Sequence, residues 1–271
     1  MLTAFAALMA LSADPAYTVV ILDPMAAELS CPCVKGYAQR DYKRLGEFLA
    51  KQTGRAVNIH YAETLAAALS KKTEGKADLV IGKDSVVRVA AKEAKLGLDH
   101  VLALTDKEGK TTMTGLFVVA AKDPALTAGD LKDYRIIFGL ADADEKYATP
   151  LKLLEELGVK APATKETCPS CSTAAGKLLE AHKAGEKAAA VISSYAQPLL
   201  EGCGTVKKGE LRVVGETDAV PFVSVFVNAK LGSDDRAALL KALLAIAKDK
   251  DLCKAMETKA GFVEPGAKKK G

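Results

Sequence analysis

The chain has 271 residues, of which 49% are hydrophobic and 27% charged, and its formal net charge is +4. The hydrophobic content is too high, and the net charge too low, for an intrinsically disordered chain. The apolar run at residues 2–11 is too short to span a bilayer. The length suits one large domain or two smaller lobes, each with its own core.

The N-terminus has the pattern of a secretory signal. The apolar run is followed by the small residues Ser12 and Ala13, although no Lys or Arg precedes it. We therefore expect a signal peptide over residues 1–13 and a periplasmic or secreted protein; a buried N-terminal helix is the alternative. In either of those compartments the cysteines would meet oxidising conditions.

Strand-like and helix-like segments alternate through the first half of the chain. Short runs rich in β-branched residues predict strands at residues 17–22, 56–60, 78–81, 99–104 and 112–120. Apolar residues at helical spacing predict helices at residues 37–51, 64–72 and 85–95.

The second half repeats this alternation. Strands are expected at residues 135–139, 188–192, 211–215 and 223–227. Helices are expected at residues 147–157, 173–184, 234–248 and 251–259, with the start of another at 197–201. Such alternation favours an α/β fold with mainly parallel sheets.

Several segments, taken in order, resemble one protein family. They are "EFLAKQTGRAVNIHYAETLAAAL", "GKADLVIGKDSVVRVAAK", "GLFVVAAKDPALTAGDLKDYRIIFG", "ADADEKYATPLKLLEELGV", "AAAVISSYAQPLL" and "LRVVGETDAVPFVSVFV". Together they are similar to the phosphate/phosphonate-type periplasmic substrate-binding proteins of ABC importers. The resemblance covers nearly the whole chain after Tyr17.

The resemblance implies two α/β lobes, each with a central, mainly parallel sheet, joined by two hinge crossings. Lobe one would comprise residues 17–110 plus 217–271, and lobe two residues 115–215. The crossings would lie near residues 111–114 and 215–221. A ligand would be held in the cleft between the lobes, and hinge motion would close the protein over it.

The loops that would face this cleft contain the candidate ligand-binding residues. Ligands of open parallel sheets lie beyond the carboxyl ends of the strands, where helix N-termini suit anions. The candidates are Lys83, Asp84, Ser85, Asp144, Lys146, Tyr147, Ser193, Ser194 and Tyr195.

One loop departs from the family pattern. Where the phosphonate binders have a Ser/Thr-rich run, this chain has the carboxylates of Asp142, Asp144 and Glu145. These charges would repel a phosphonate, and Lys83 and Lys146 would compensate only in part. Ordinary capping of the following helix is the alternative role for the carboxylates.

Cysteines form the other departure. Cys31 and Cys33 fall in a lobe-one loop, and Cys168 and Cys171 precede a lobe-two helix, so the resemblance places both pairs around one cleft. Four converging thiolates would suit copper, zinc or an iron-containing centre. The alternatives are a local disulfide between Cys168 and Cys171 or a disulfide that crosses between the lobes.

The two remaining cysteines, Cys203 and Cys253, each lie beside a predicted helix end. We expect a structural disulfide between them, with two buried thiols as the alternative.

Several other classes of function are disfavoured. There is no Trp and no basic stripe interleaved with aromatic residues, so nucleic-acid binding is not expected. The three histidines lack metal-ligand or triad spacing, and no GxSxG, Walker or GxGxxG pattern is present, so no enzyme is expected.

The sequence thus predicts a monomeric periplasmic solute-binding protein. The main hypothesis for its ligand is a metal ion or metal cofactor held by the four cleft cysteines. The first alternative is phosphate or phosphonate binding as part of an ABC importer, and the second is a thiol redox or interaction protein. The expected partner is a membrane permease or a periplasmic redox protein.

Overall fold

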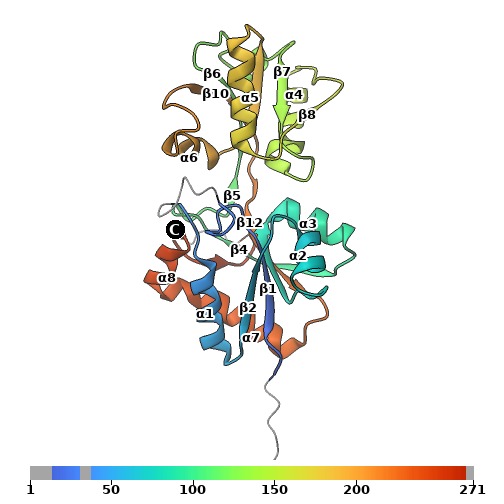
Figure 1. The fold of residues 1–271 in the computed structure, drawn as a ribbon, viewed down its shortest axis with the longest axis vertical. Coiled ribbons are helices and arrows are strands. Elements are labelled where there is room, and N and C mark those ends of the chain that lie inside the picture. Colours follow the sequence, from blue (N-terminus) through green and yellow to red (C-terminus); the bar gives the residue numbers. More distant parts are fainter. Residues whose placement is uncertain (1–13, 31–37, 267–271) are drawn as a thin grey trace, which may run out of the picture.

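Helices and strands alternate along the chain and gather in two stacked lobes (Figure 1). The structure, a computed structural model, describes residues 14–30 and 38–266. We call the part built on the six-stranded sheet the first lobe and the part built on the five-stranded sheet the second lobe. The predicted signal peptide lies outside the described residues.

The first lobe has strands from both ends of the chain. They are β1 (Tyr17–Leu22), β2 (Val57–Tyr61), β3 (Leu79–Lys83), β4 (Leu98–Leu104), β12 (Val223–Asn228) and β13 (Phe262–Val263). Their order in the sheet is β13-β4-β12-β3-β1-β2. β1 is parallel to β2 and β3, whereas β12 is antiparallel to both β3 and β4.

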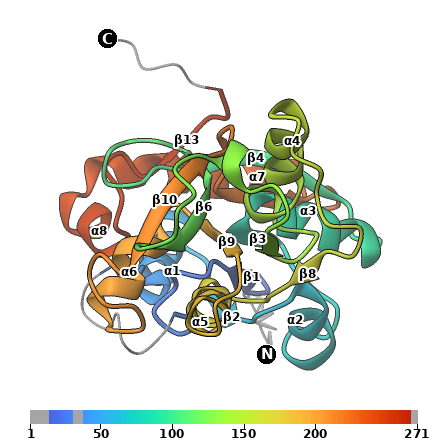
Figure 2. The same cartoon turned by 90° about the horizontal axis from the view of Figure 1, so that it is seen from above.

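Helices cover both faces of this sheet. They are α1 (Tyr42–Thr53), α2 (Leu65–Lys71), α3 (Asp84–Glu93), α7 (Ser233–Ala245), the 3-10 helix η4 (Ile246–Lys248) and α8 (Lys250–Ala255). Figures 1 and 2 both show α1 and α8 on one side of the sheet and α2 and α3 on the other.

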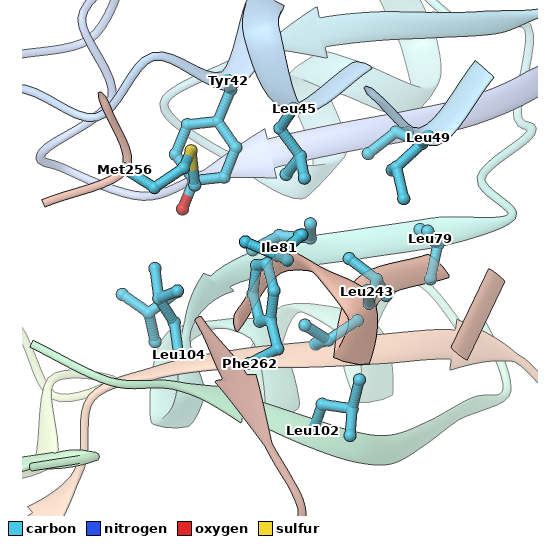
Figure 3. Close-up of a cluster of buried hydrophobic side chains, with 14 of the residues drawn as sticks. Tyr42, Leu45, Leu49, Leu79, Ile81, Leu102, Leu104, Leu243, Met256 and Phe262 are labelled. Atoms are coloured by element: carbon cyan, nitrogen blue, oxygen red, sulfur yellow. The ribbon is translucent and has the colours of Figure 1, made fainter. Parts of the chain in front are cut away.

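The two faces of β1 supply two separate cores, because successive side chains of a strand point to opposite faces. Val19 and Ile21 pack in the cluster that includes α1, α7 and α8, while Val20 and Leu22 pack with α2 and α3. Figure 3 shows the first of these clusters, in which Leu45 of α1 lies toward the sheet.

The second lobe has β6 (Gly115–Ala120), β7 (Arg135–Phe138), β8 (Glu166–Thr167), β9 (Ala188–Ser193) and β10 (Leu211–Glu216). The order is β10-β6-β9-β7-β8, with β7 parallel to β8 and β9 and β6 antiparallel to β9 and β10. Its helices are η2 (Ala128–Asp130), η3 (Asp144–Lys146), α4 (Ala148–Glu156), α5 (Cys171–Lys183) and α6 (Ala196–Gly202).

Two chain segments cross between the lobes and pair with each other. β5 (Thr112–Met113) and β11 (Val220–Pro221) form an antiparallel two-stranded ribbon. Next to it, the Gly115 N–H donates to the Thr217 hydroxyl, and the Thr217 N–H donates to the Gly115 carbonyl. The two crossing segments are therefore hydrogen-bonded to each other.

The predicted α/β class is confirmed, and the detail of strand pairing differs from the prediction. Both sheets are mixed, because chain segments returning from the other lobe enter them in the antiparallel direction: β12 in the first sheet and β6 in the second. Among the described residues, no helix combines the length and apolar character needed to cross a membrane.

Candidate functional site

A cleft of about 790 Å³ lies between the two lobes. Its edges include the segments that follow β1, β3 and β7 and the first turn of α5. Helix N-termini and free backbone N–H groups point toward this edge of an open α/β sheet. The volume lies within the range of about 300–1,000 Å³ that is typical of small-molecule sites.

Much of the cleft wall is apolar. It includes Met25, Leu65 and Val86 from the first lobe and Leu140 and Leu199 from the second. Such walls bury the organic part of a ligand, while a few polar groups orient it.

A buried ion pair joins the lobes beside the cleft. The Lys83 Nζ at the end of β3 lies 2.5 Å from Oε1 of Glu145 in η3. The Ser193 hydroxyl at the end of β9 donates to the same oxygen at 2.6 Å. Glu145 and Ser193 are fully buried, and Lys83 is 7% exposed and lines the cleft.

The environment of this pair shifts the pKa of nearby groups. Burial lowers the pKa of Lys83, and the attraction of Glu145 opposes that shift. Burial, followed by the charges of Glu145 and Asp84, raises the pKa of Asp144. Burial is thus the first cause of both shifts, and the neighbouring charges modify it.

A second contact between the lobes lies beside the ion pair. The Ser85 hydroxyl in the first turn of α3 donates to the Asp142 carbonyl at 2.7 Å. The same hydroxyl accepts the Asp144 N–H at 3.2 Å. One side chain of the first lobe thus binds two backbone groups of the second.

A buried polar network supports the first-lobe side of the site. Asp23, directly after β1, accepts from the Arg40 guanidinium at 2.8 Å and from the Tyr42 hydroxyl at 2.7 Å. Arg40 also lies over the ring of Phe222, which stacks on Tyr195 of the second lobe with ring centroids 5.0 Å apart. This network connects Asp23, at the end of β1, with a tyrosine of the other lobe.

The predicted ligand-binding residues gather near the cleft in different roles. Lys83, Lys146 and Tyr195 line it. Ser85 and Ser193 make the contacts described above, Ser194 accepts from the Thr114 N–H, and Asp84 pairs with Arg88. Tyr147 packs edge-on against Phe138 in the second-lobe core. Their roles in binding remain predictions.

The cysteines do not form the predicted cluster in the described part of the chain. Cys168 is 2% exposed and packs in the apolar cluster beneath α5, whereas Cys171 lines the cleft and its sulfur accepts from the Ser193 N–H. Cys31 and Cys33 lie outside the described residues. Within residues 14–30 and 38–266, no group of three or more His, Cys, Asp or Glu could hold a metal ion. The metal hypothesis therefore gains no support.

The predicted disulfide between Cys203 and Cys253 is wrong, because both are free cysteines in different lobes. The Cys253 thiol donates to the Ile246 carbonyl beside α8, and the Cys203 thiol donates to the Leu200 carbonyl in α6. No disulfide joins Cys168 to Cys171 either, since both are free.

Two parts of the site were missed in the sequence. Neither Glu145 nor Asp23 is among the predicted ligand-binding residues, and Glu145 is predicted only as one of several repelling charges. Each carries a partial signal. A lysine at the end of a buried strand needs a counter-charge, and an aspartate that closes an apolar strand is a candidate for a buried network.

Comparison with known families gives a match over most of the chain. A family model described as "ABC transporter, phosphonate, periplasmic substrate-binding protein" matches residues 36–269. No curated protein sequence matches the chain.

Solved structures of similar fold come from several bacteria. XAC2383 from Xanthomonas citri bound to ATP is 17% identical, with a TM-score of 0.68 and 92% of each chain covered. PhnD1 from Prochlorococcus marinus in complex with methylphosphonate is 15% identical, with a TM-score of 0.66 and 92% of each chain covered. A binding protein component of an ABC phosphonate transporter from Pseudomonas aeruginosa is also 15% identical, with a TM-score of 0.66 and coverage of 92% of this chain and 81% of that one.

At these identities the likeness shows the fold alone, and it confirms the predicted two-lobed architecture of periplasmic binding proteins. The family assignment comes from the family model, which matches most of the residues. The predicted resemblance runs through the same segments. The chain belongs to the family of periplasmic substrate-binding proteins of phosphonate ABC transporters.

Proposed function

We propose that the protein captures a phosphonate-type oxyanion in the cleft between its lobes and delivers it to a membrane permease. The observation that carries this proposal is the convergence of Lys83 and Ser193, from different lobes, on one carboxylate oxygen beside the cleft. The cation comes from the first lobe and the hydroxyl from the second, so an anion bound to both would hold the lobes together.

The chemistry of these donors suits an oxyanion. Hydrogen bonds between charged groups are shorter and about twice as strong as neutral ones. Burial strengthens them further, because the effective dielectric constant is lower than in water. The apolar walls, with Leu65 and Leu199 on opposite lobes, would bury the organic substituent of a phosphonate.

Family membership supports the same reading. The matched family consists of transport proteins, in agreement with the expectation that the chain is not an enzyme. Among the proteins of similar fold, PhnD1 is described in complex with methylphosphonate. We propose a periplasmic location for this protein on the same basis.

Calorimetric titration tests the proposal. We expect methylphosphonate or another alkylphosphonate to bind, and Lys83→Met to weaken that binding by roughly 10- to 100-fold, since a hydrogen bond to a charged group contributes about 1.5–3 kcal/mol. Lys92→Met, at an exposed position of α3, is the matched control and should bind like the wild type.

Because Lys83→Met leaves Glu145 without its cation, thermal unfolding should be recorded for each variant. The double variant Lys83→Met/Glu145→Gln removes both charges and provides a folded comparison. Absence of heat from the wild type with phosphate, phosphite and alkylphosphonates would contradict the proposal.

A further inference from the structure

The donors that would bind an anion in the cleft are already occupied by a side chain of the protein. Both the Lys83 ammonium and the Ser193 hydroxyl donate to Oε1 of Glu145, at 2.5 Å and 2.6 Å. Glu145 has no exposed surface, so its carboxylate is buried behind the cleft wall that Lys83 lines.

Tight packing of the backbone holds Glu145 in this position. It is the central residue of η3, and the strand β6 passes so close that a Cβ at Gly115 would overlap the Glu145 carbonyl. The next residue, Lys146, packs against Gly139, where a Cβ would overlap its side chain. Two glycines therefore provide the space in which this turn lies.

The carboxylate is only partly satisfied where it lies. Oε2 of Glu145 is buried and has no hydrogen-bond partner among the described residues. An ionised carboxylate can accept about four hydrogen bonds, and an unpaired buried polar atom is costly. An oxyanion that took the place of Glu145 on Lys83 and Ser193 would therefore displace a carboxylate that has only part of its hydrogen bonds.

The same pair connects the two lobes through the protein's own side chains. Lys83 belongs to the first lobe, and Glu145 belongs to the second. Ser85 adds a second connection through its bonds to the backbone of Asp142 and Asp144. The contacts that a bound anion would make between the lobes are thus made by the chain itself.

We propose that Glu145 is a built-in competitor for the acidic group of the ligand, which occupies Lys83 and Ser193 in the empty protein and must give them up when the ligand binds. This inference rests on the proposed function. Because one anion exchanges for another, the acidic group adds less affinity than it would in a site whose donors were free. Ligands whose organic part also fills the apolar walls are favoured over inorganic phosphate.

The variant Glu145→Gln tests this exchange. Glutamine keeps the size of the side chain and an oxygen for Ser193 but removes the charge, so Lys83 becomes free to bind an anion. In calorimetric titrations with methylphosphonate and with inorganic phosphate, we expect at least tenfold tighter binding than in the wild type, with the larger gain for phosphate. Glu180→Gln, on the exposed side of α5, makes the same charge change away from the cleft and should bind like the wild type.

Small-angle scattering supplies an independent readout. Ligand-free wild type should be compact and should contract little with methylphosphonate. Ligand-free Glu145→Gln should have a larger radius of gyration and should contract when methylphosphonate is added. If Glu145→Gln does not unfold cooperatively, Glu145→Ser replaces it in both experiments.

The outcomes separate the two proposals. Wild type that binds methylphosphonate, with Glu145→Gln binding equally or more weakly, overturns the competitor role and leaves the proposed function standing. Wild type and variant that both give no heat with any of the anions overturn the proposed function and the competitor role together. Ligand-free Glu145→Gln that is as compact as wild type overturns the closing role of Glu145.

Discussion

At the scale of single residues, Gly115 shows how little space surrounds the site. It begins β6 and is buried, and a Cβ there would overlap the backbone of Glu145. Gly176 offers a contrast within the same lobe, because a Cβ there meets nothing within 4 Å. Position 115 therefore has no room for a side chain, whereas position 176 has room for a methyl group.

Gly115→Ala should lower the free energy of unfolding by roughly 1–3 kcal/mol, which is the usual cost of overpacking. Gly176→Ala should raise it by up to about 1 kcal/mol, because alanine is the better helix former and α5 has room for it. Urea unfolding of both variants checks this. Equal effects of the two substitutions would contradict the close approach at Gly115.

Residue types alone indicated some members of the site and not their partners. Lys83 and Ser193 are predicted because they lie in loops that follow strands and face the expected cleft. Glu145 was visible only as part of an acidic run, since nothing local tells which of three neighbouring carboxylates turns inward. The turn η3 makes that choice by burying Glu145 while Asp142 and Asp144 stay half-buried.

At the scale of elements, capping decided where two helices begin. The predicted helix at residues 37–51 starts at Tyr42, because the Asp41 side chain accepts the Arg44 N–H and ends the extended chain before it. Likewise α5 starts at Cys171, since the Ser170 hydroxyl accepts the Thr173 N–H.

The cap of α5 also explains why the CxxC pair does not converge. Cys168 lies in the extended chain before the cap and packs inward, 2% exposed, whereas Cys171 lies in the first helical turn and lines the cleft. A change of backbone conformation between the two residues turns their side chains in different directions. Spacing alone could not show this.

Asp41→Ala should lower the free energy of unfolding by about 1 kcal/mol, because it leaves a backbone N–H at the start of α1 without its acceptor. Lys43→Ala, at an exposed position one residue into the same helix, should change it by less than about 0.5 kcal/mol. Chemical denaturation measures both. A loss at Lys43 as large as that at Asp41 would contradict the capping role.

At the scale of the whole molecule, contacts between distant parts of the chain hold the first lobe together. The Tyr17 hydroxyl at the start of β1 donates to Asp235 of α7 at 2.6 Å, across 218 positions of sequence. Arg55 donates to both oxygens of the same carboxylate. The hydrogen bond from Tyr17 has the largest effect in lowering the pKa of Asp235, followed by the bonds from Arg55.

A lowered pKa in the folded protein means that the ionised carboxylate stabilises it. That contribution is present above the ordinary aspartate pKa of about 3.9 and is lost as the pH falls through the lowered value. Asp235→Asn should therefore be less stable than wild type at pH 7 and lose less stability on acidification. Urea midpoints from pH 7 to pH 2 test this, with exposed Asp234→Asn as the control expected to follow wild type.

The sequence by itself determined the order of the elements and the α/β class, because periodicity, caps and turn residues act over a few positions. It also carried the family resemblance, which depends on that order. The sequence did not determine that both sheets are mixed. The direction of β12 and β6 depends on where the chain returns from the other lobe.

Only the tertiary structure decided which groups meet. Lys83 and Glu145 are 62 positions apart and belong to different lobes, so their ion pair depends on how the two lobes pack together. Cys203 and Cys253 fall in different lobes by the predicted bounds as well, and the structure leaves both thiols free. Local patterns specify elements, whereas the distance between two side chains depends on how all the elements between them pack.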